Sequence, residues 1–276
     1  MKFIRRIIVT TAAGTFTDLH ITFDVAKTLT GEPNEATITI TNLTDASRAL
    51  INEEGAEITL EAGYEREGNV GVIFKGYVRD VVHEREDTDI ITTIEAGDGD
   101  KSQRESYVPK EYPEGTTPED MVRDIQTMMK GVELGELKFP DEAKQPTERP
   151  TAFMAPPHRA LDELGRSFNF YWSVQNGALE CVPGDGFLDH VSYITPQTGM
   201  IGKPTITDAG IIVKVLLDPD IRPNRQVYVQ SETTDREGRS GLYRVSSIAY
   251  GGDNRNGEFY CELEAELING GKTVTK

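Results

Sequence analysis

The sequence predicts a mainly β protein, α+β overall, in which two similar β units flank a small α+β domain. Segments that alternate between apolar and polar residues, as half-buried strands do, recur toward both ends of the chain. Their order between residues 34 and 98 returns between residues 210 and 267, and two amphipathic helical patterns lie between these regions. We therefore expect three domains, over residues 1–105, 106–188 and 189–276.

The first β unit begins with two predicted strands, over residues 3–9 and 20–25, in which apolar side chains recur at alternate positions. Residues 36–42 give the clearest strand, because one alanine and two isoleucines alternate with three threonines. Further strands are predicted over residues 57–63 and 72–82. The charged residues that follow, 83–89, indicate a turn, and residues 90–96 the closing strand.

A short helix is expected over residues 43–54, between two of these strands. Thr44 is a suitable N-cap and Gly55 a suitable end for this helix. Its apolar face is expected to consist of Ala46, Leu50 and Ile51.

The second β unit has the same order of parts. Residues 218–224 replace the short helix and residues 232–241 form a polar loop, and Glu264 and Ala265 stand where Glu95 and Ala96 stand in the first unit. The strands are predicted over residues 211–217, 226–231, 242–250 and 259–267. The alternative is that two unrelated β domains share generic hairpin chemistry.

The middle domain is predicted to contain two helices and a hairpin, after a polar boundary over residues 97–115. The first helix begins at Thr117 as N-cap, with Pro118 at its first position and Asp120 closing a capping box. Its apolar face is formed by Met121, Ile125, Met128 and Met129, and Gly131 ends it.

An extended connection over residues 134–157 leads to the second helix, over residues 157–168. The hairpin after it is turned by Asn176 and Gly177, a pair typical of tight two-residue turns.

The composition argues against a nucleic-acid-binding surface, because the net charge is −17 and phosphate contacts need clustered Lys and Arg. Cys181 and Cys261 lack the spacing of a metal site, and we expect both to be buried free thiols. The N-terminus has the pattern of a strand and not of a signal peptide, and no segment has the ~20 apolar residues of a membrane span. We expect the chain to be made in the cytoplasm.

No motif for catalysis, cofactor binding or metal binding is present: there is no phosphate-binding loop, zinc-protease motif, serine-hydrolase motif or cysteine pair. We therefore predict no catalytic, cofactor-binding or metal-binding residues, and no enzyme activity. Asp98, Asp100 and Glu105 are better explained as a polar domain edge than as a cation site. The four histidines are scattered, and the acidic tip is expected to be a solvated turn, with Glu84, Glu86, Asp87 and Asp89.

Several of these segments resemble the baseplate hub proteins of phage tails and phage-like particles. The resemblance covers nearly the whole chain but includes no catalytic motif. It is carried by Asn42 and Leu43, by Gly76 within residues 74–78, by residues 92–99, 160–164 and 170–174, by Asn176 and Gly177, and by residues 193–204 and 210–219.

This resemblance implies a structural virion protein with two β-barrels of tail-tube type per subunit. Three subunits would form a pseudo-six-fold ring that seats the tail tube on one side and a three-fold spike on the other. The implied partners are a tail tube or distal tail protein, the central spike and the tape measure protein, with DNA only in transit. The internal repeat gives the physical reason, because a trimer matches six-fold symmetry only if each chain carries the interface twice.

Three other functions stay open at this point. A distal-tail-type ring protein would share the barrels but form hexamers. A tail-associated cell-wall hydrolase would need a pair of acids, and a carbohydrate-binding module would need exposed aromatic platforms, whereas this chain has a single Trp.

Overall fold

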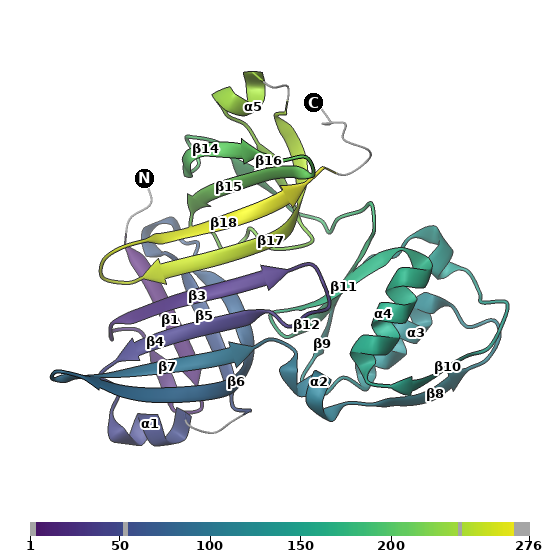
Figure 1. Cartoon of the computed structure of the whole chain (residues 1–276), viewed down its shortest axis with the longest axis horizontal. Coiled ribbons are helices and arrows are strands. Elements are labelled where there is room, and N and C mark those ends of the chain that lie inside the picture. Colours follow the sequence, from purple (N-terminus) through teal and green to yellow (C-terminus); the bar gives the residue numbers. More distant parts are fainter. Residues whose placement is uncertain (1–3, 52–54, 237–238, 268–276) are drawn as a thin grey trace.

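The computed structural model describes residues 4–51, 55–236 and 239–267, and it is mainly β (Figure 1). Thirteen of the described strands form one sheet, and a smaller unit with two long helices lies to one side of it. None of the described helices is long and apolar enough to cross a bilayer.

The first β unit contains seven strands and two short helices among its described residues. They are β1 (Arg5–Thr11), β2 (Gly14–Phe16), β3 (Ile21–Thr28), β4 (Glu35–Thr41), α1 (Asp45–Ile51), β5 (Glu57–Tyr64), η1 (Glu65–Glu67), β6 (Gly71–Glu86) and β7 (Asp89–Gly97). The second β unit contains β13 (Val191–Ile194), β14 (Met200–Ile206), β15 (Gly210–Leu216), β16 (Gln226–Val229), α5 (Glu232–Arg236), β17 (Gly241–Asp253) and β18 (Phe259–Glu266).

The predicted repeat of strand order is confirmed by the hydrogen-bonded neighbours. The first unit has the order β3-β4-β7-β6-β5-β1 and the second has β14-β15-β18-β17-β16-β13. Neighbouring strands are antiparallel throughout, except that β13 runs parallel to β16 where β1 runs antiparallel to β5. This shared order favours a repeat over two unrelated β domains.

The repeat extends to an irregularity in the register. Between β6 and β7 the pairing skips Arg79, so that Val78 lies opposite Ala96 and Asp80 opposite Glu95. Between β17 and β18 the pairing skips Ser246, so that Val245 lies opposite Ala265 and Ser247 opposite Glu264. A β-bulge, in which one strand carries an extra residue, therefore occurs at the same place in both units.

The strict alternation of the sequence explains the packing of these strands. In β4, the alanine and the two isoleucines at alternate positions are buried, while Thr37 is exposed and Thr39 and Thr41 are partly exposed. Buried side chains from both β units form one continuous apolar core, and the middle unit has a second core of its own.

The middle unit combines a parallel and an antiparallel pairing. Its β11–β12 hairpin pairs through β12 with β9, which runs parallel, and a separate pair is formed by β8 and β10. Its elements are α2 (Asp100–Glu105), β8 (Val108–Tyr112), α3 (Pro118–Thr127), β9 (Glu133–Leu137), η2 (Asp141–Lys144), β10 (Thr151–Ala155), α4 (Pro157–Phe168), β11 (Phe170–Gln175) and β12 (Ala178–Pro183).

The two long helices of the middle unit begin where the sequence predicts. The Thr117 hydroxyl accepts the backbone N–H of Asp120 at 3.1 Å, as predicted for the cap of α3. The buried face of α3 includes Met121, Val122 and Ile125. The predicted second helix, α4, has the expected bounds.

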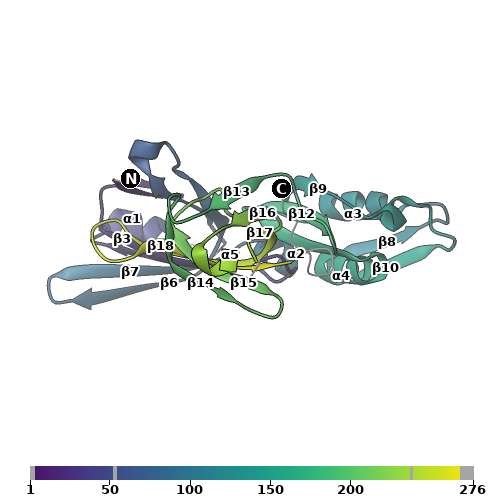
Figure 2. The same ribbon diagram turned by 90° about the horizontal axis from the view of Figure 1, so that it is seen from above.

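Four segments differ from the prediction. Residues 83–86, expected in a turn, extend β6 and pair with β7, and this hairpin projects beyond the sheet (Figure 2). The boundary over residues 97–115 contains α2 and β8, the connection over 134–157 contains two short strands, and the loop over 232–241 begins with α5. The strands β8, β9 and β10 are short, and their pairing partners are distant in the sequence.

The short helix of the first unit is also packed differently from the prediction. Ile51 is buried, but Ala46 and Leu50 are exposed, so only one of the three expected side chains contacts the core. The predicted end of this helix at residue 54, and Phe3 of the first strand, lie outside the described residues.

Candidate functional site: the seam between the β units and the hairpin junction

The two β units are joined by backbone hydrogen bonds between β3 and β17. Residues 22–28 of β3 lie antiparallel to residues 247–253 of β17. The same edge of β17 pairs with β16 over residues 241–244, so the edge is shared between two partners. The strand passes from one partner to the other at the bulge at Ser246. We call the β3–β17 contact the seam.

The seam makes one continuous layer of strands, β15, β18, β17, β3, β4 and β7, across the molecule (Figure 1). Its inner face contributes to the shared core. Its outer face carries exposed acidic side chains, and we call this surface the acidic face: Asp24, Glu35, Glu95, Glu262 and Glu264.

At the seam, the acidic face carries small side chains. Ala26 and Ala249 lie opposite each other there, and a hollow of about 250 Å³ opens beside them, with Asp24 and Glu35 in its lining. The nearby cations are paired with acids. Arg79 contacts Glu35 and Asp100. Lys214 lies 3.7 Å from Glu258 and over the ring of Tyr260. The surface that remains is acidic.

A cluster of buried polar residues joins the middle unit to the β units. The tip of the β11–β12 hairpin, Asn176 and Gly177, enters between the ends of β3, β4 and β7. Both tip residues have positive φ values of 53° and 80°, which explains the Asn-Gly pair. We call this contact the hairpin junction, formed by Lys27, Asn34, Asp98, Gln175, Asn176, Glu180, Asn224 and Arg225.

Side chains bind several strand ends at the hairpin junction, whereas Asp98 Oδ2 and Asn224 Oδ1 are buried without a hydrogen-bond partner among the described residues. Lys27 Nζ donates to Asn176 Oδ1 at 2.5 Å, and the backbone N–H of Gly177 donates to Asp98 Oδ1 at 3.0 Å. Asn34 Nδ2 donates to the carbonyl of Val174 at 2.7 Å. Buried polar groups of this kind cost little when all are bonded and much when one is not.

Lys27 and Asp98 are opposite charges that both bind the hairpin tip, and each is 1% exposed. Burial raises the pKa of Asp98 to about 7, although Lys27 opposes this shift. Burial likewise lowers the pKa of Lys27 to about 8, although Asp98 opposes it. Both shifts have the direction expected for charges removed from water.

The second β unit reaches the same junction through Arg225 and Asn224. Arg225 donates to Glu180 on β12 at 3.1 Å, and Asn224 Nδ2 donates to the other oxygen of Glu180 at 3.1 Å. Arg244 of β17 also donates to the carbonyl of Gly186 at 2.8 Å. The middle unit is therefore held by both β units through polar contacts.

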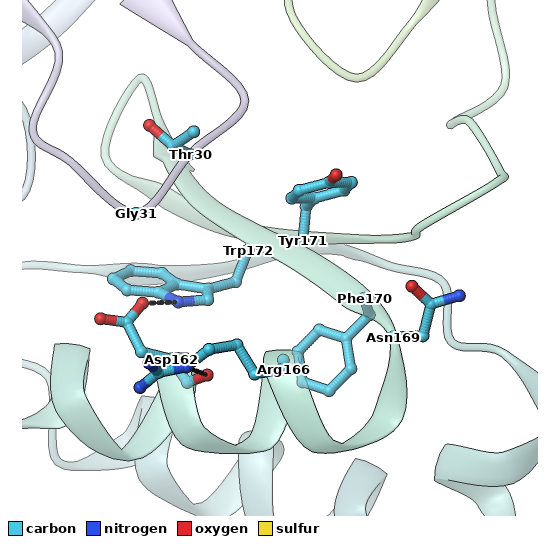
Figure 3. Close-up of a pocket in the computed structure, with 9 residues that line it drawn as sticks. Thr30, Gly31, Asp162, Arg166, Asn169, Phe170, Tyr171 and Trp172 are labelled. Atoms are coloured by element: carbon cyan, nitrogen blue, oxygen red, sulfur yellow. Dashed lines mark hydrogen bonds between the residues drawn. The ribbon is translucent and has the colours of Figure 1, made fainter. Parts of the chain in front are cut away.

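A hollow of about 350 Å³ lies where the β3–β4 loop meets α4 and β11 (Figure 3). Trp172 lies between this loop and α4, and its indole N–H donates to Asp162 at 2.9 Å. A Cβ on Gly31 would lie 2.2 Å from the Trp172 ring, so only glycine permits this approach. This contact locks the loop against the middle unit.

The three acids considered from the sequence as a cation site lie in three separate contacts. Asp98 belongs to the hairpin junction, Asp100 pairs with Arg79, and Glu105 pairs with Lys130 at 3.5 Å. Among the described residues there is no group of three or more potential metal ligands. Both cysteines are buried, and neither forms a disulfide.

The remaining candidates are dispersed in the same way. The acidic tip, including Glu84 and Glu86, lies exposed on the projecting hairpin. The histidines lie in four different places: His20 contacts Asp253, His83 contacts Thr92, His158 lies on α4 and His190 precedes β13. The helix predicted to run to Gly131 ends at Thr127, so Met128 and Met129 follow α3. Met121 and Met129 nevertheless belong to the core of the middle unit, and Met128 packs against it.

Sequence reasoning missed the seam and the hairpin junction. One signal was available: Lys27 follows Ile21, Phe23 and Val25 at the inward positions of β3. A lysine on a buried face requires an acid or several acceptors.

The fold is similar to that of solved tail proteins and of a secretion-system component. It resembles a 43 kDa tail protein of prophage MuSo2 from Shewanella oneidensis, with a TM-score of 0.67, 10% identity, and 96% of this chain and 97% of that chain covered. A tail protein from Neisseria meningitidis gives a TM-score of 0.68 and 9% identity over 96% of this chain and 97% of that chain.

A third similar structure is a component of the type VI secretion system of Escherichia coli, described as similar to the T4 tail proteins gp27 and gp5. Its TM-score is 0.62 at 11% identity, with 91% of this chain and 74% of that chain covered. No curated protein matches the sequence.

The chain belongs to the baseplate hub gp41 family, whose profile matches residues 7–265. The family and the fold give it a structural role in a phage tail. The resemblance inferred from the sequence is thereby confirmed.

Proposed function

We propose that this protein is a baseplate hub that forms a trimeric ring, connects the tail tube to the central spike, and leaves an axial channel through which DNA passes. The observation that carries the proposal is the repeat of strand order and bulge within one continuous sheet. Each chain then supplies two equivalent β units, and three chains supply six. A ring of this kind presents six similar units to a tube and three to a spike.

We further propose that residues 1–105 and 189–276 act as the two hub domains and residues 106–188 as a domain attached to them. The partners of the ring would be a tail tube or distal tail protein, the central spike and the tape measure protein. The ring would be assembled in the host cytoplasm and function in the virion. Its role would be structural, without catalysis.

The acidic face supports the part of the proposal that concerns DNA. It spans the seam, so it belongs to both hub domains at once, and the cations beside it, Arg79 and Lys214, lie close to acids. A channel lined by Lys and Arg would bind phosphates and slow passage, whereas acids repel them.

The test is the mass of the purified protein in solution, alone and with its tube and spike partners. The hub predicts three copies. Six copies would favour the alternative of a distal-tail-type ring. A protein that stays monomeric at high concentration and with both partners would overturn the proposal.

A further inference from the structure

We propose that Lys27 and Asn176 become joined by an isopeptide bond within the folded chain. Lys27 Nζ attacks the side-chain amide carbon of Asn176, and ammonia leaves. The bond ties β3 of the first β unit covalently to the tip of the β11–β12 hairpin in the middle unit. It is a modification of the chain itself and does not depend on the proposed function.

The two reacting groups are already in contact. Lys27 Nζ lies 2.5 Å from Asn176 Oδ1, so it lies beside the carbon that carries this oxygen. The other end of the amide, Asn176 Nδ2, donates to the carbonyl of Val72 at 3.2 Å. The amide is therefore held at both ends with the amine next to it. Groups held in this way react without the cost of bringing them together.

The site favours the neutral amine, which is the form of lysine that attacks a carbonyl carbon. Lys27 is 1% exposed. An ammonium has three N–H donors, yet Asn176 Oδ1 is its one hydrogen-bond acceptor among the described residues. Burial lowers the pKa of Lys27 to about 8, as expected for a lysine removed from water.

Asp98 is the proton acceptor of this site. Its Oδ1 accepts the backbone N–H of Gly177 at 3.0 Å, and its Oδ2 is buried without a hydrogen-bond partner among the described residues. Asp98 and Lys27 lie close enough for each to shift the pKa of the other. Burial raises the pKa of Asp98 to about 7, so a proton passes from the ammonium to the carboxylate at small cost. The protonated carboxyl then stabilises negative charge that develops on Asn176 Oδ1.

The reaction balances without any further reactant. The bond between Lys27 Nζ and Asn176 Cγ forms, and the bond between Cγ and Nδ2 breaks. Two protons leave Nζ and pass to Nδ2, the first by way of Asp98, so Nδ2 leaves as an ammonium ion. Asp98 returns to its starting carboxylate. Val72, beside Nδ2, is 36% exposed, which gives the ammonium ion a path to solvent.

A competing reaction is typical of Asn-Gly pairs. The backbone nitrogen of the glycine attacks the same side-chain carbon and also expels ammonia. At Asn176 this nitrogen is held, because the N–H of Gly177 donates to Asp98. Asn256 and Gly257, in the exposed turn between β17 and β18, form a second Asn-Gly pair in the described chain and serve as the comparison.

The test is the mass of the full-length protein and of its peptides after incubation at about pH 7.5. The chain should become lighter by one ammonia. Digestion of the denatured protein should give a branched peptide that contains both Lys27 and Asn176, and trypsin should no longer cut after Lys27. The rate should not depend on protein concentration, because the bond forms within one chain. The peptide that contains Asn256 should never be joined to Lys27.

The pH dependence of the rate tests the role of Asp98. The reactive form holds one proton between Lys27 and Asp98, so the rate should be highest between about pH 7 and 8 and fall about tenfold per pH unit on either side. The other charges that shift the pKa of Lys27 are Glu180, Arg222 and Arg225, and they help to set the position of this maximum. Attack by a backbone nitrogen instead becomes steadily faster as the pH rises.

Protein kept at about pH 5 should stay unlinked, because the amine then remains protonated. Unfolding measured at once on such protein reports Lys27 and Asp98 before the bond forms. Lys27→Arg keeps the positive charge but removes the nucleophile, so Asn176 of this variant should keep its ammonia. Asp98→Asn should slow the linkage by about a hundredfold or more.

Two outcomes would overturn the proposal. If Asn176 loses ammonia equally in Lys27→Arg, the attacking group is the nitrogen of Gly177. If the wild type keeps its full mass for days at about pH 7.5, while Trp172 emission shows that it is folded, the contact is a hydrogen bond and nothing more. Neither outcome concerns the hub, which is tested by the number of copies in the ring.

Discussion

At the scale of single residues, the hairpin junction shows how far a sequence can be interpreted. Lys27 occupies an inward position in β3, so a buried partner could have been predicted, and Asp98 was already a candidate acid. The pairing itself could not be predicted, because Asp98 follows β7 and lies far along the chain from Lys27. Asn176 was predicted to form a turn because of its backbone preference. Its side-chain contact with Lys27 could not be predicted, because that contact depends on how the domains meet.

The Lys27–Asp98 pair is expected to be strongly coupled. Asp98→Asn leaves a buried ammonium without its anion and should lower the free energy of unfolding by about 3 kcal/mol. Lys27→Met should cost less, because Asp98 can then take up a proton. The double variant should lie close to the wild type. Denaturant unfolding of all four proteins gives the coupling, and strictly additive losses would contradict it.

The same pair predicts a pH dependence of stability. The folded-state pKa of Asp98 is raised to about 7, so its contribution is fully present below its unfolded pKa of about 3.9 and is lost as the pH rises through 7. The folded-state pKa of Lys27 is lowered to about 8, so its contribution is present above an unfolded pKa of about 10.4 and is lost as the pH falls through 8.

The stability of the wild type relative to Lys27→Met/Asp98→Asn should therefore be lowest between pH 7 and 8 and rise on both sides. Urea unfolding at a series of pH values measures this difference. A difference that is constant with pH would show that the two groups do not titrate as buried charges.

Gly31 offers a test of the contact between the β3–β4 loop and the middle unit. Gly31→Ala places a methyl group against Trp172, so the indole should move and its emission should shift to longer wavelength. Because Trp172 is the single Trp of the chain, fluorescence reports this site alone. Gly71→Ala, where the nearest atom would be 3.1 Å away on Pro219, is a control distant from the indole and should leave the emission unchanged.

At the scale of elements, the strands with one buried face and the capped helices were predictable, since each carries its signal locally. The β6–β7 ribbon beyond Val82 was not, because both of its faces meet solvent and its residues do not alternate. The short strands β8, β9 and β10 owe their existence to partners elsewhere in the middle unit, so local propensity was insufficient to identify them.

Helix α3 gives the prediction at this scale. Thr117→Ala removes an acceptor for the Asp120 N–H and should lower stability by about 1 kcal/mol. Ile125→Asp should cost far more, because Ile125 is fully buried and the new carboxylate would have no partner. Thermal unfolding compares the two, and equal small effects would mean that α3 does not depend on its buried face.

At the scale of the whole molecule, the order of strands was predictable and the seam was not. The repeat was visible because each unit carries the same sequence of alternating segments. The β3–β17 pairing joins residues more than 200 positions apart, and an edge strand has the same alternation whether or not another strand lies beside it. The seam shows that the two units of the repeat are already assembled side by side within one chain.

The acidic face gives the last prediction. Asp24 and Glu262 are exposed on β3 and β18, on either side of the seam. If this face lines the channel, Asp24→Lys/Glu262→Lys should leave the trimer intact, because both side chains are exposed on strands inside the layer and not on its end strands. It should nevertheless slow genome ejection from assembled particles, since each new cation can bind a passing phosphate, and the delay should shrink as salt is raised.

The control for this prediction is Glu142→Lys/Glu148→Lys, which makes the same change of charge on the exposed surface of the middle unit. Ejection can be followed by the DNA released from particles after triggering, at low and at moderate salt. A delay that is equal for both pairs would be an effect of net charge and would remove the acidic face from the channel. A delay that is confined to Asp24→Lys/Glu262→Lys and is relieved by salt requires that DNA pass along this face. Salt relieves it because it screens the attraction between the new lysines and nearby phosphates.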